Sequence, residues 1–180
     1  MGIVLLDMAM SLDGMTTNSN GKSLYPIEQL RNTSALNEII RTTGAVVMDR
    51  AAYEEAAGDF TGYEYQMPIF VLTDKEPETV AKGENDKLRF NFITEGIDKV
   101  VEYAKRAAGD LNVTLVGGVA AARLCLKAGL LDEILVRRIS LLVGGGTRFF
   151  EDFGEAEIKL KIVHSVAFVN RIDTRYRIVR

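Results

Sequence analysis

Residues 112–128, NVTLVGGVAAARLCLKA, decide the fold. Residues 113–116 are apolar or β-branched and predict a short buried strand, while the apolar spacing over 119–127 predicts a helix. Gly117-Gly118 therefore forms a strand-to-helix turn. Two residues without a Cβ let a ligand approach the backbone, and the free N–H groups that open a helix attract anions. The stretch predicts an α/β fold with a candidate phosphate site at this turn.

The Gly-Gly pair also fits a second interpretation, in which it is only a tight connection between strand and helix. A dinucleotide-binding fingerprint has three glycines, and residues 119–122 add none. The pair alone leaves both interpretations open.

The composition is that of a globular protein without a strong charge bias. The 180 residues are 47% apolar and 26% charged, with a net charge of −3, so we expect one domain over residues 1–180 and no polybasic surface for nucleic acid. No apolar run reaches the roughly 20 residues of a membrane span, and the first residues lack the basic start of a secretory signal. We therefore expect a cytoplasmic protein without membrane or nucleic-acid partners.

The single histidine and the single cysteine exclude several kinds of catalytic site. His164 stands in an expected strand, and no second histidine or cysteine pair is present to complete a zinc site of usual spacing. No Gly-x-Ser-x-Gly elbow accompanies it. Cys125 lies among apolar residues of the expected helix and is interpreted as a packing residue. We therefore expect neither a metal site nor a protein nucleophile.

Strand and helix patterns alternate up to about residue 130, and strands without helices follow. The segment 27–42 has helical spacing but is interrupted at Asn32-Thr33-Ser34, where a second helix would be capped. Asn170-Arg171 is a two-residue link suited to a hairpin. The order predicts an α/β fold with a mostly parallel central sheet and an antiparallel C-terminal hairpin. Its strands are expected at residues 3–10, 44–48, 67–73, 90–94, 113–116, 133–142, 159–169 and 172–179, and further helices at 51–57, 97–108 and 119–127.

Five segments together resemble one family. They are AMSLDG at 9–14, VMDRAAYE at 47–54, VGG at 116–118, LLDE at 130–133 and LVGGGTRFF at 142–150. In this order and spacing they are similar to the reductase domain of riboflavin-biosynthesis deaminase-reductases, which shares the three-layer fold of dihydrofolate reductase. No deaminase zinc motif precedes the domain, so the chain resembles the stand-alone members. The resemblance implies an NAD(P)H-dependent oxidoreductase that reduces a ring compound or a ribosylamino-pyrimidine.

The resemblance also implies where NADPH and the substrate bind. The phosphates would lie at the Gly-Gly helix and at the turn after the second strand, and the 2′-phosphate near the end of the third strand. The nicotinamide and the substrate ring would meet beside the first strand, with the glycine loop 144–147 opposite. The implied cofactor residues are Ala9, Arg50, Ala52, Thr73, Lys75, Val116, Gly117, Gly118, Val119 and Ala120, and the implied substrate residues are Met8, Asp13, Gly14, Gly145 and Thr147.

Two positions depart from the family pattern. Asp49 stands where the family usually has glycine, and Ala52 where it has threonine. A carboxylate at this turn would repel a phosphate by about 1 kcal/mol at about 4 Å in water, and by more when shielded from solvent. Arg50 remains to pair with a phosphate and offset the repulsion. We therefore expect NADPH as the cofactor, with NADH or weakened binding as alternatives.

The proton donor has two candidates. Reduction of a C=N or C=O bond needs an acid or an ordered water near the hydride acceptor. Asp13 belongs to the Ser-Leu-Asp-Gly segment, and Glu28 lies near the start of the first helix. Each also has a structural interpretation, Asp13 as a residue that caps the turn and Glu28 as an exposed carboxylate favoured by the helix dipole.

Three functions stay open. The first is the NADPH-dependent reductase, which requires an open groove from Ala9 past Gly118 to Thr73. The second is a non-catalytic nucleotide-binding or regulatory module that kept the fold with weakened cofactor binding. The third is a flavin- or nucleotide-binding protein that uses the same Gly-Gly turn. By resemblance to the family we also expect a homodimer, with the strand at 133–142 at the interface.

Overall fold

The computed structural model describes residues 2–78, 81–151 and 157–180, and its strands form one eight-stranded sheet. The strand order is β4-β3-β2-β5-β1-β6-β8-β7. β1 to β6 pair in parallel, and β8 runs antiparallel to both β6 and β7. The strands are β1 (Val4–Ser11), β2 (Thr43–Asp49), β3 (Ile69–Leu72), β4 (Phe90–Ile93), β5 (Asn112–Val116), β6 (Glu133–Ile139), β7 (Leu160–Ala167) and β8 (Arg171–Ile178). The predicted sheet, mostly parallel and ending in an antiparallel hairpin, is confirmed.

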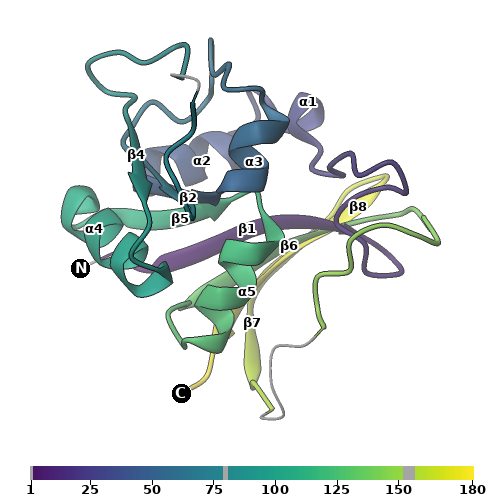
Figure 1. The fold of residues 1–180 in the computed structure, drawn as a ribbon. Coiled ribbons are helices and arrows are strands. Elements are labelled where there is room, and N and C mark those ends of the chain that lie inside the picture. Colours follow the sequence, from purple (N-terminus) through teal and green to yellow (C-terminus); the bar gives the residue numbers. More distant parts are fainter. Residues whose placement is uncertain (1, 79–80, 152–156) are drawn as a thin grey trace.

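In the described part of the chain, five helices cover the two faces of this sheet (Figure 1). They are α1 (Ile27–Leu30), α2 (Ser34–Thr42), α3 (Arg50–Glu55), α4 (Ile97–Ala108) and α5 (Val119–Lys127). α4 and α5 pack on one face, over Leu6 and Met8 of β1. α1, α2 and α3 pack on the other face, over Leu5 of β1 and Val46 of β2. None of the described helices combines the length and the apolar character needed to cross a membrane.

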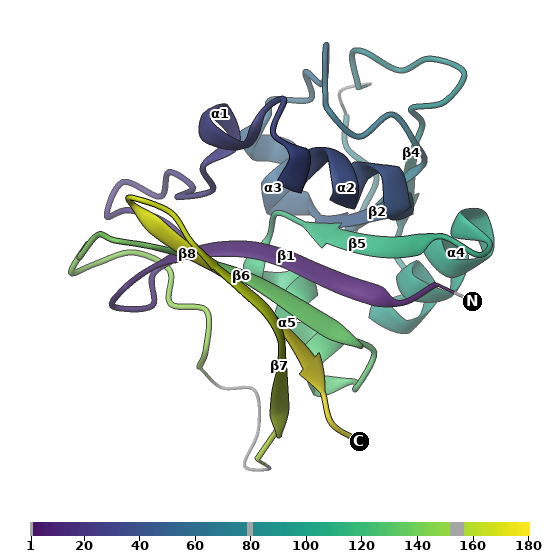
Figure 2. The same cartoon turned by 180° about the vertical axis from the view of Figure 1, so that it is seen from behind.

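β1 is the centre of the sheet, between β5 and β6, as the view from behind shows (Figure 2). All eight of its residues are buried. Successive side chains point to opposite faces, and helices cover both faces, so the strand is apolar almost throughout. Asp7 is the exception, a carboxylate with only 1% of its surface exposed.

The helical segment after the first loop is divided where the sequence predicted. α1 ends at Leu30, and the Thr33 hydroxyl then accepts a hydrogen bond from the Leu36 N–H, at 3.3 Å, to cap α2. Asn32 between them has a positive φ of 62°, a conformation that asparagine tolerates better than most residues. A capping residue after a left-handed residue therefore starts a new helix.

The C-terminal hairpin ends the sheet with an exposed edge. β8 pairs with both β6 and β7, whereas β7 is exposed along nearly its whole length. The interface expected at residues 133–142 stays a prediction; within the sheet, β6 is an interior strand that pairs with β1 on one side and with β8 on the other. Its Arg137 side chain, 1% exposed, points into the interior.

Candidate functional site

The predicted strand-to-helix turn lies at the carboxyl end of β5. Gly117 and Gly118 have φ angles of 73° and 83°, which glycine adopts without a steric penalty. Gly118 is the N-cap of α5 and has no side chain to satisfy the first N–H groups of the helix. The turn therefore presents backbone donors to a neighbouring acceptor, as the sequence predicted.

That acceptor is the carboxylate of Asp49, the last residue of β2. β2 pairs in parallel with β5, so both strands end at the same edge of the sheet. Asp49 Oδ2 accepts hydrogen bonds from the Ala120 N–H at 3.0 Å and the Ala121 N–H at 3.4 Å, and Oδ1 accepts one from the Ala52 N–H at 3.0 Å. One carboxylate thus binds the first turns of both α3 and α5, where the helix dipoles favour negative charge.

The two turns are packed closely around this carboxylate. A Cβ added to Gly118 would lie 2.1 Å from the Asp49 carboxyl group, and one added to Gly117 would lie 3.0 Å from the Ala52 Cβ. Asp49 is only 4% exposed. Gly118 is therefore required by the Asp49 side chain itself, and the expected open groove past Gly118 is closed at this point by Asp49.

The neighbouring cofactor candidates are engaged with protein groups. Arg50 pairs with Glu54 at 2.6 Å and with Asp74 at 2.8 Å, and these hydrogen bonds raise the pKa of Arg50. The Thr73 hydroxyl donates to the Lys75 carbonyl at 2.6 Å and accepts from the Lys75 N–H. In this arrangement the Arg50 guanidinium pairs with two carboxylates, and its contact with a phosphate stays a prediction.

Three further cofactor candidates lie at the same turn, and a fourth lies on β1. Val116 and Val119 flank the two glycines and are half-buried, and Ala120 is exposed. Ala9, on β1, is 5% exposed. The structure thus brings the candidates of β5, α5 and the β2–α3 turn together.

Asp13 anchors the glycine loop that follows β6. Its carboxylate accepts from the Ser11 hydroxyl at 2.6 Å, from the Val143 N–H at 3.1 Å and from the Gly144 N–H at 2.8 Å. These hydrogen bonds lower the pKa of Asp13 to about 2, and the one from Ser11 has the largest effect. These contacts fit the structural interpretation of Asp13, and its role as a proton donor stays a prediction.

The glycine loop and the loop after β1 are held against each other, as the resemblance implied. The Thr147 N–H donates to the Thr17 hydroxyl at 2.9 Å, and the Thr16 N–H donates to the Thr147 carbonyl at 2.8 Å. Gly14, with a φ of 83°, and the half-buried Gly145 lie in these two loops. The loop-borne substrate candidates are therefore neighbours at the carboxyl ends of β1 and β6.

Two candidates lie elsewhere. Met8 packs in the core beneath α4 and α5 and is 6% exposed. The Glu28 side chain is 77% exposed and pairs with Arg31 at 3.2 Å on the surface of α1. The structure therefore supports the surface interpretation of Glu28. Met8 fills the core, whereas the resemblance placed it beside the substrate.

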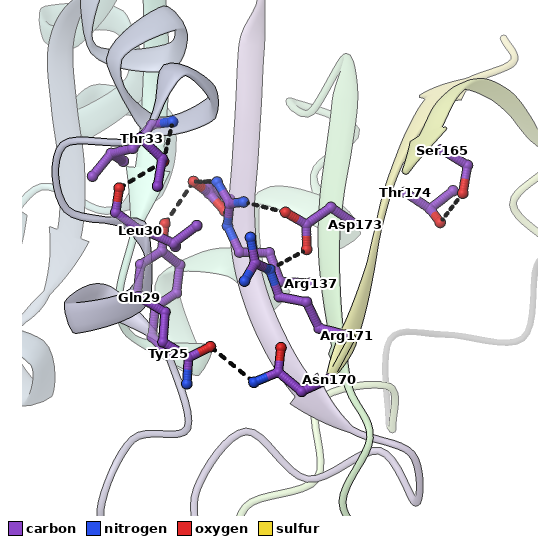
Figure 3. Close-up of polar contacts among 12 residues, drawn as sticks. Tyr25, Gln29, Leu30, Thr33, Arg137, Ser165, Asn170, Arg171, Asp173 and Thr174 are labelled. Carbon is purple, nitrogen blue, oxygen red and sulfur yellow. Dashed lines mark hydrogen bonds and ion pairs between the residues drawn. The ribbon is translucent and has the colours of Figure 1, made fainter. Parts of the chain in front are cut away.

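An unpredicted network of buried charges lies on the α1 face of the sheet (Figure 3). Arg137 donates to Asp7 through Nε and Nη2, both at 2.9 Å, and to Asp173 through Nη1 at 2.7 Å. Asp173 also accepts from Arg171 at 2.9 Å, and Asp7 accepts from the Tyr25 hydroxyl at 2.7 Å. Burial, followed by the negative charge of Asp7, raises the pKa of Tyr25.

This network joins four parts of the chain. Its members come from β1, the segment before α1, β6 and β8. Below it in Figure 3, Asn170 donates to Gln29 of α1 at 3.1 Å. The sequence signal for it was the charge of Asp7 inside an apolar run, but Arg137 lies 130 residues away, and a single sequence does not pair the two.

The described residues hold no metal site, and an open pocket lies away from the Gly-Gly turn. Among residues 2–78, 81–151 and 157–180 no group of histidine, cysteine, aspartate and glutamate side chains is arranged to hold a metal ion. An open pocket of about 300 Å³ lies at the end of β6, lined by Leu12, residues 138–142 and Ile172. It is a different place from the turn that Asp49 occupies.

Comparison with known sequences identifies relatives along almost the whole chain. The model of the RibD C-terminal domain matches residues 3–173. YwjB of Bacillus subtilis (strain 168), a protein named as uncharacterized, is 24% identical over 176 residues, which make up 96% of this chain and 95% of that protein.

Solved structures share the fold at low sequence identity. A Shewanella sp. PV-4 protein provisionally assigned to riboflavin biosynthesis has a TM-score of 0.80 and 23% identity, with 99% of each chain covered. The diaminohydroxyphosphoribosylaminopyrimidine deaminase/5-amino-6-(5-phosphoribosylamino)uracil reductase of Thermotoga maritima has a TM-score of 0.76 and 16% identity, covering 99% of this chain and 57% of that one. Dihydrofolate reductase of Enterococcus faecalis, complexed with NADP(H), has a TM-score of 0.68 and 16% identity, covering 99% and 98%. The predicted dihydrofolate reductase-like fold is confirmed.

Proposed function

The chain belongs to the RibD C-terminal domain family, and from that premise we propose that it is a pyrimidine-reductase-like oxidoreductase. The observation that carries the proposal is the family match over residues 3–173, which includes every element around the Gly-Gly turn. The structural relatives that have this fold include a uracil-type reductase and a dihydrofolate reductase. Fold likeness alone does not fix a reaction, so the family match is the stronger support.

We propose a ring compound of the ribosylamino-pyrimidine type as the substrate and a reduced nicotinamide nucleotide, bound weakly and without phosphate contacts at the Gly-Gly turn, as the hydride donor. The Thermotoga relative is named for reduction of a phosphoribosylamino-uracil, and the Enterococcus relative was crystallised with NADP(H). When bound, such a cofactor supplies the hydride, and the protein supplies alignment and a dry pocket. The loops that Asp13 and Thr147 hold together are the proposed substrate side of the site.

The pyrophosphate of a dinucleotide does not fit the turn that the family resemblance implies for it. The donors of that turn, the Ala120, Ala121 and Ala52 N–H groups, are already bound to Asp49. We therefore assign no phosphate contact to this turn in the wild-type protein.

A second candidate function follows from the same carboxylate. A member of the family that has filled its anion site with its own side chain fits a binding or regulatory module that kept the fold and lost the cofactor. Asp49 is the specific observation that favours this candidate.

An activity screen separates the two candidates. The purified protein is mixed with millimolar NADPH or NADH and a panel of ribosylamino-pyrimidines and pterins, and the loss of nicotinamide absorbance is followed. The reductase proposal predicts oxidation that depends on the ring compound and falls when Asp13→Asn loosens the glycine loop. Glu38→Gln is the matched control, because Glu38 pairs with Arg41 on the exposed side of α2. If no compound of the panel causes oxidation of NADPH or NADH, the result favours the second candidate.

We also propose that the chain self-associates through the edge strand β7. Leu160 is 44% exposed, Ile162 61% and Val163 45%, and an uncovered apolar edge strand invites pairing with another strand. A second copy placed by two-fold symmetry would continue the sheet across two β7 strands. Light scattering after size exclusion should give a dimer that Ile162→Lys converts to a monomer. Leu124→Lys, a change at an exposed apolar residue of α5, should leave the dimer intact, and a monomeric wild type would refute the proposal.

A further inference from the structure

The Asp49 carboxylate lies between the first turns of α3 and α5 and occupies the position where their N–H groups would bind an anion. It accepts hydrogen bonds from one N–H of α3 and from two of α5. We infer that Asp49 is a built-in substitute for the pyrophosphate of a dinucleotide, so that this turn is closed to NADPH and NADH in the wild-type protein. The inference rests on the proposed function only for the identity of the excluded ligand.

Steric and electrostatic effects act in the same direction. A pyrophosphate bound to the Ala120 and Ala121 N–H groups would have to occupy the volume of the Asp49 carboxyl group, which lies only 2.1 Å from the Cβ position of Gly118. A phosphate that approached beside Asp49 would meet a like charge with little water between them. Arg50, the one neighbouring cation of this turn that the resemblance implied for phosphate, is bound to Glu54 and Asp74.

The closed turn also explains how two helix ends stay together without a ligand. Each helix N-terminus carries unsatisfied N–H groups and partial positive charge. A family member with glycine at this position would leave these groups to water or to a bound anion. Here Asp49 satisfies three of them at once, and its burial keeps water out. The folded protein therefore already has the contacts that cofactor phosphates would otherwise supply.

The donors themselves are intact, so removing the carboxylate should uncover a working anion site. The backbone of Asp49 is extended, with φ −97° and ψ 172°, which alanine adopts without strain. Asp49→Ala therefore removes the anion but keeps the backbone, whereas Asp49→Asn removes the charge and keeps the side-chain volume. The family-like change Ala52→Thr should not open the turn, because it leaves the Asp49 carboxylate on the Ala120 and Ala121 N–H groups.

The inference is tested by titrating inorganic pyrophosphate and NADPH separately into wild type, Asp49→Ala and Asp49→Asn by calorimetry. We expect Asp49→Ala to bind both ligands at least roughly tenfold more tightly than wild type, since two or more charge-assisted hydrogen bonds become available. Asp49→Asn should gain less, because its amide still fills the turn. Equal affinities of wild type and Asp49→Ala for both ligands would overturn the inference, as would tight binding of NADPH to the wild type.

The outcomes separate this inference from the proposed function. If Asp49→Ala gains affinity for pyrophosphate and the wild type has no reductase activity, the closed turn is supported and the reductase proposal is contradicted. If the wild type binds NADPH tightly and reduces a ring compound, the reductase proposal is supported and the closed turn is contradicted. Circular dichroism first checks that the variants fold. Should Asp49→Ala not fold, the wild-type titration with NADPH still decides the inference, because the closed turn predicts that it shows no tight binding.

Discussion

Replacement of Arg137 by methionine tests the buried charge network that joins β1, β6 and β8. The Arg137 side chain is 1% exposed and makes two hydrogen bonds to Asp7 and one to Asp173. In the variant Asp7 would keep only the Tyr25 hydroxyl as a donor, while Asp173 would keep Arg171. Removing one member of a buried ion group costs about 3–5 kcal/mol, because the remaining charge stays buried without compensation.

A loss of this size is a large part of the usual stability of a domain, about 5–15 kcal/mol. With about 2–4 °C per kcal/mol for a chain of this length, the midpoint of thermal unfolding should fall by about 6–20 °C. Urea denaturation followed by circular dichroism measures the free energy of unfolding directly. Arg138→Met is the matched control, because Arg138 is the next residue of β6 and is exposed, and it should change stability by less than about 0.5 kcal/mol.

The double variant Asp7→Leu with Arg137→Met tests the cause of the loss. Without the Asp7 carboxylate less uncompensated charge is buried, so the double variant should be more stable than Arg137→Met alone. A loss below about 1 kcal/mol in Arg137→Met, or a double variant less stable than the single one, would refute the assignment of this network as a buried ion group whose members depend on one another.

Three further predictions concern single side chains. The pKa of Asp13 is lowered to about 2 by its hydrogen bonds, so its stabilising effect is complete above the unfolded pKa of about 4 and is lost as the pH falls toward about 2. Urea midpoints measured between about pH 5 and pH 2 should therefore fall less steeply in Asp13→Asn than in the wild type. Parallel curves for the two proteins would contradict this prediction. Among the described residues, the buried Tyr65 hydroxyl has no hydrogen-bond partner, so Tyr65→Phe should raise the free energy of unfolding by about 1 kcal/mol; a decrease would mean that the hydroxyl is satisfied. Burial raises the pKa of the Cys125 thiol to about 12, so a thiol reagent at about pH 8 should label it only after denaturation, and rapid labelling of the folded protein would show that α5 opens.

Local sequence signals located the elements of the fold well where one residue type fixes the backbone. Gly117 and Gly118 mark the strand-to-helix turn, and both have the positive φ angles that glycine permits. Thr33 caps α2 as predicted. α4 and α5 have the predicted bounds because their apolar spacing is regular and each follows a glycine.

The sequence was less informative where distant residues meet. The departure of Asp49 from glycine placed a carboxylate near the phosphate turn, but its hydrogen bonds to Ala120 and Ala121 depend on the pairing of β2 with β5. Asp7 and Arg137 each have an unusual charge for their strands, and only the parallel register of β1 and β6 brings them together. Arg137 is buried inside the protein, where this register places it against Asp7.

For Asp13 the sequence motif itself fits two different roles. Its segment motif is shared by a substrate-site role and a turn-capping role, and the two differ only in what the carboxylate contacts. The structure supplies those contacts, the Val143 and Gly144 N–H groups of a loop 130 residues away. A motif in one sequence does not contain that information.

The most direct test of the account is a crystal structure of the wild-type protein grown in the presence of NADPH. We predict that the Asp49 carboxylate stays on the Ala120 and Ala121 N–H groups and that no pyrophosphate lies at the start of α5. A pyrophosphate bound to these N–H groups, with the Asp49 side chain turned away, would contradict the central claim that this side chain has taken the place of the cofactor's phosphates.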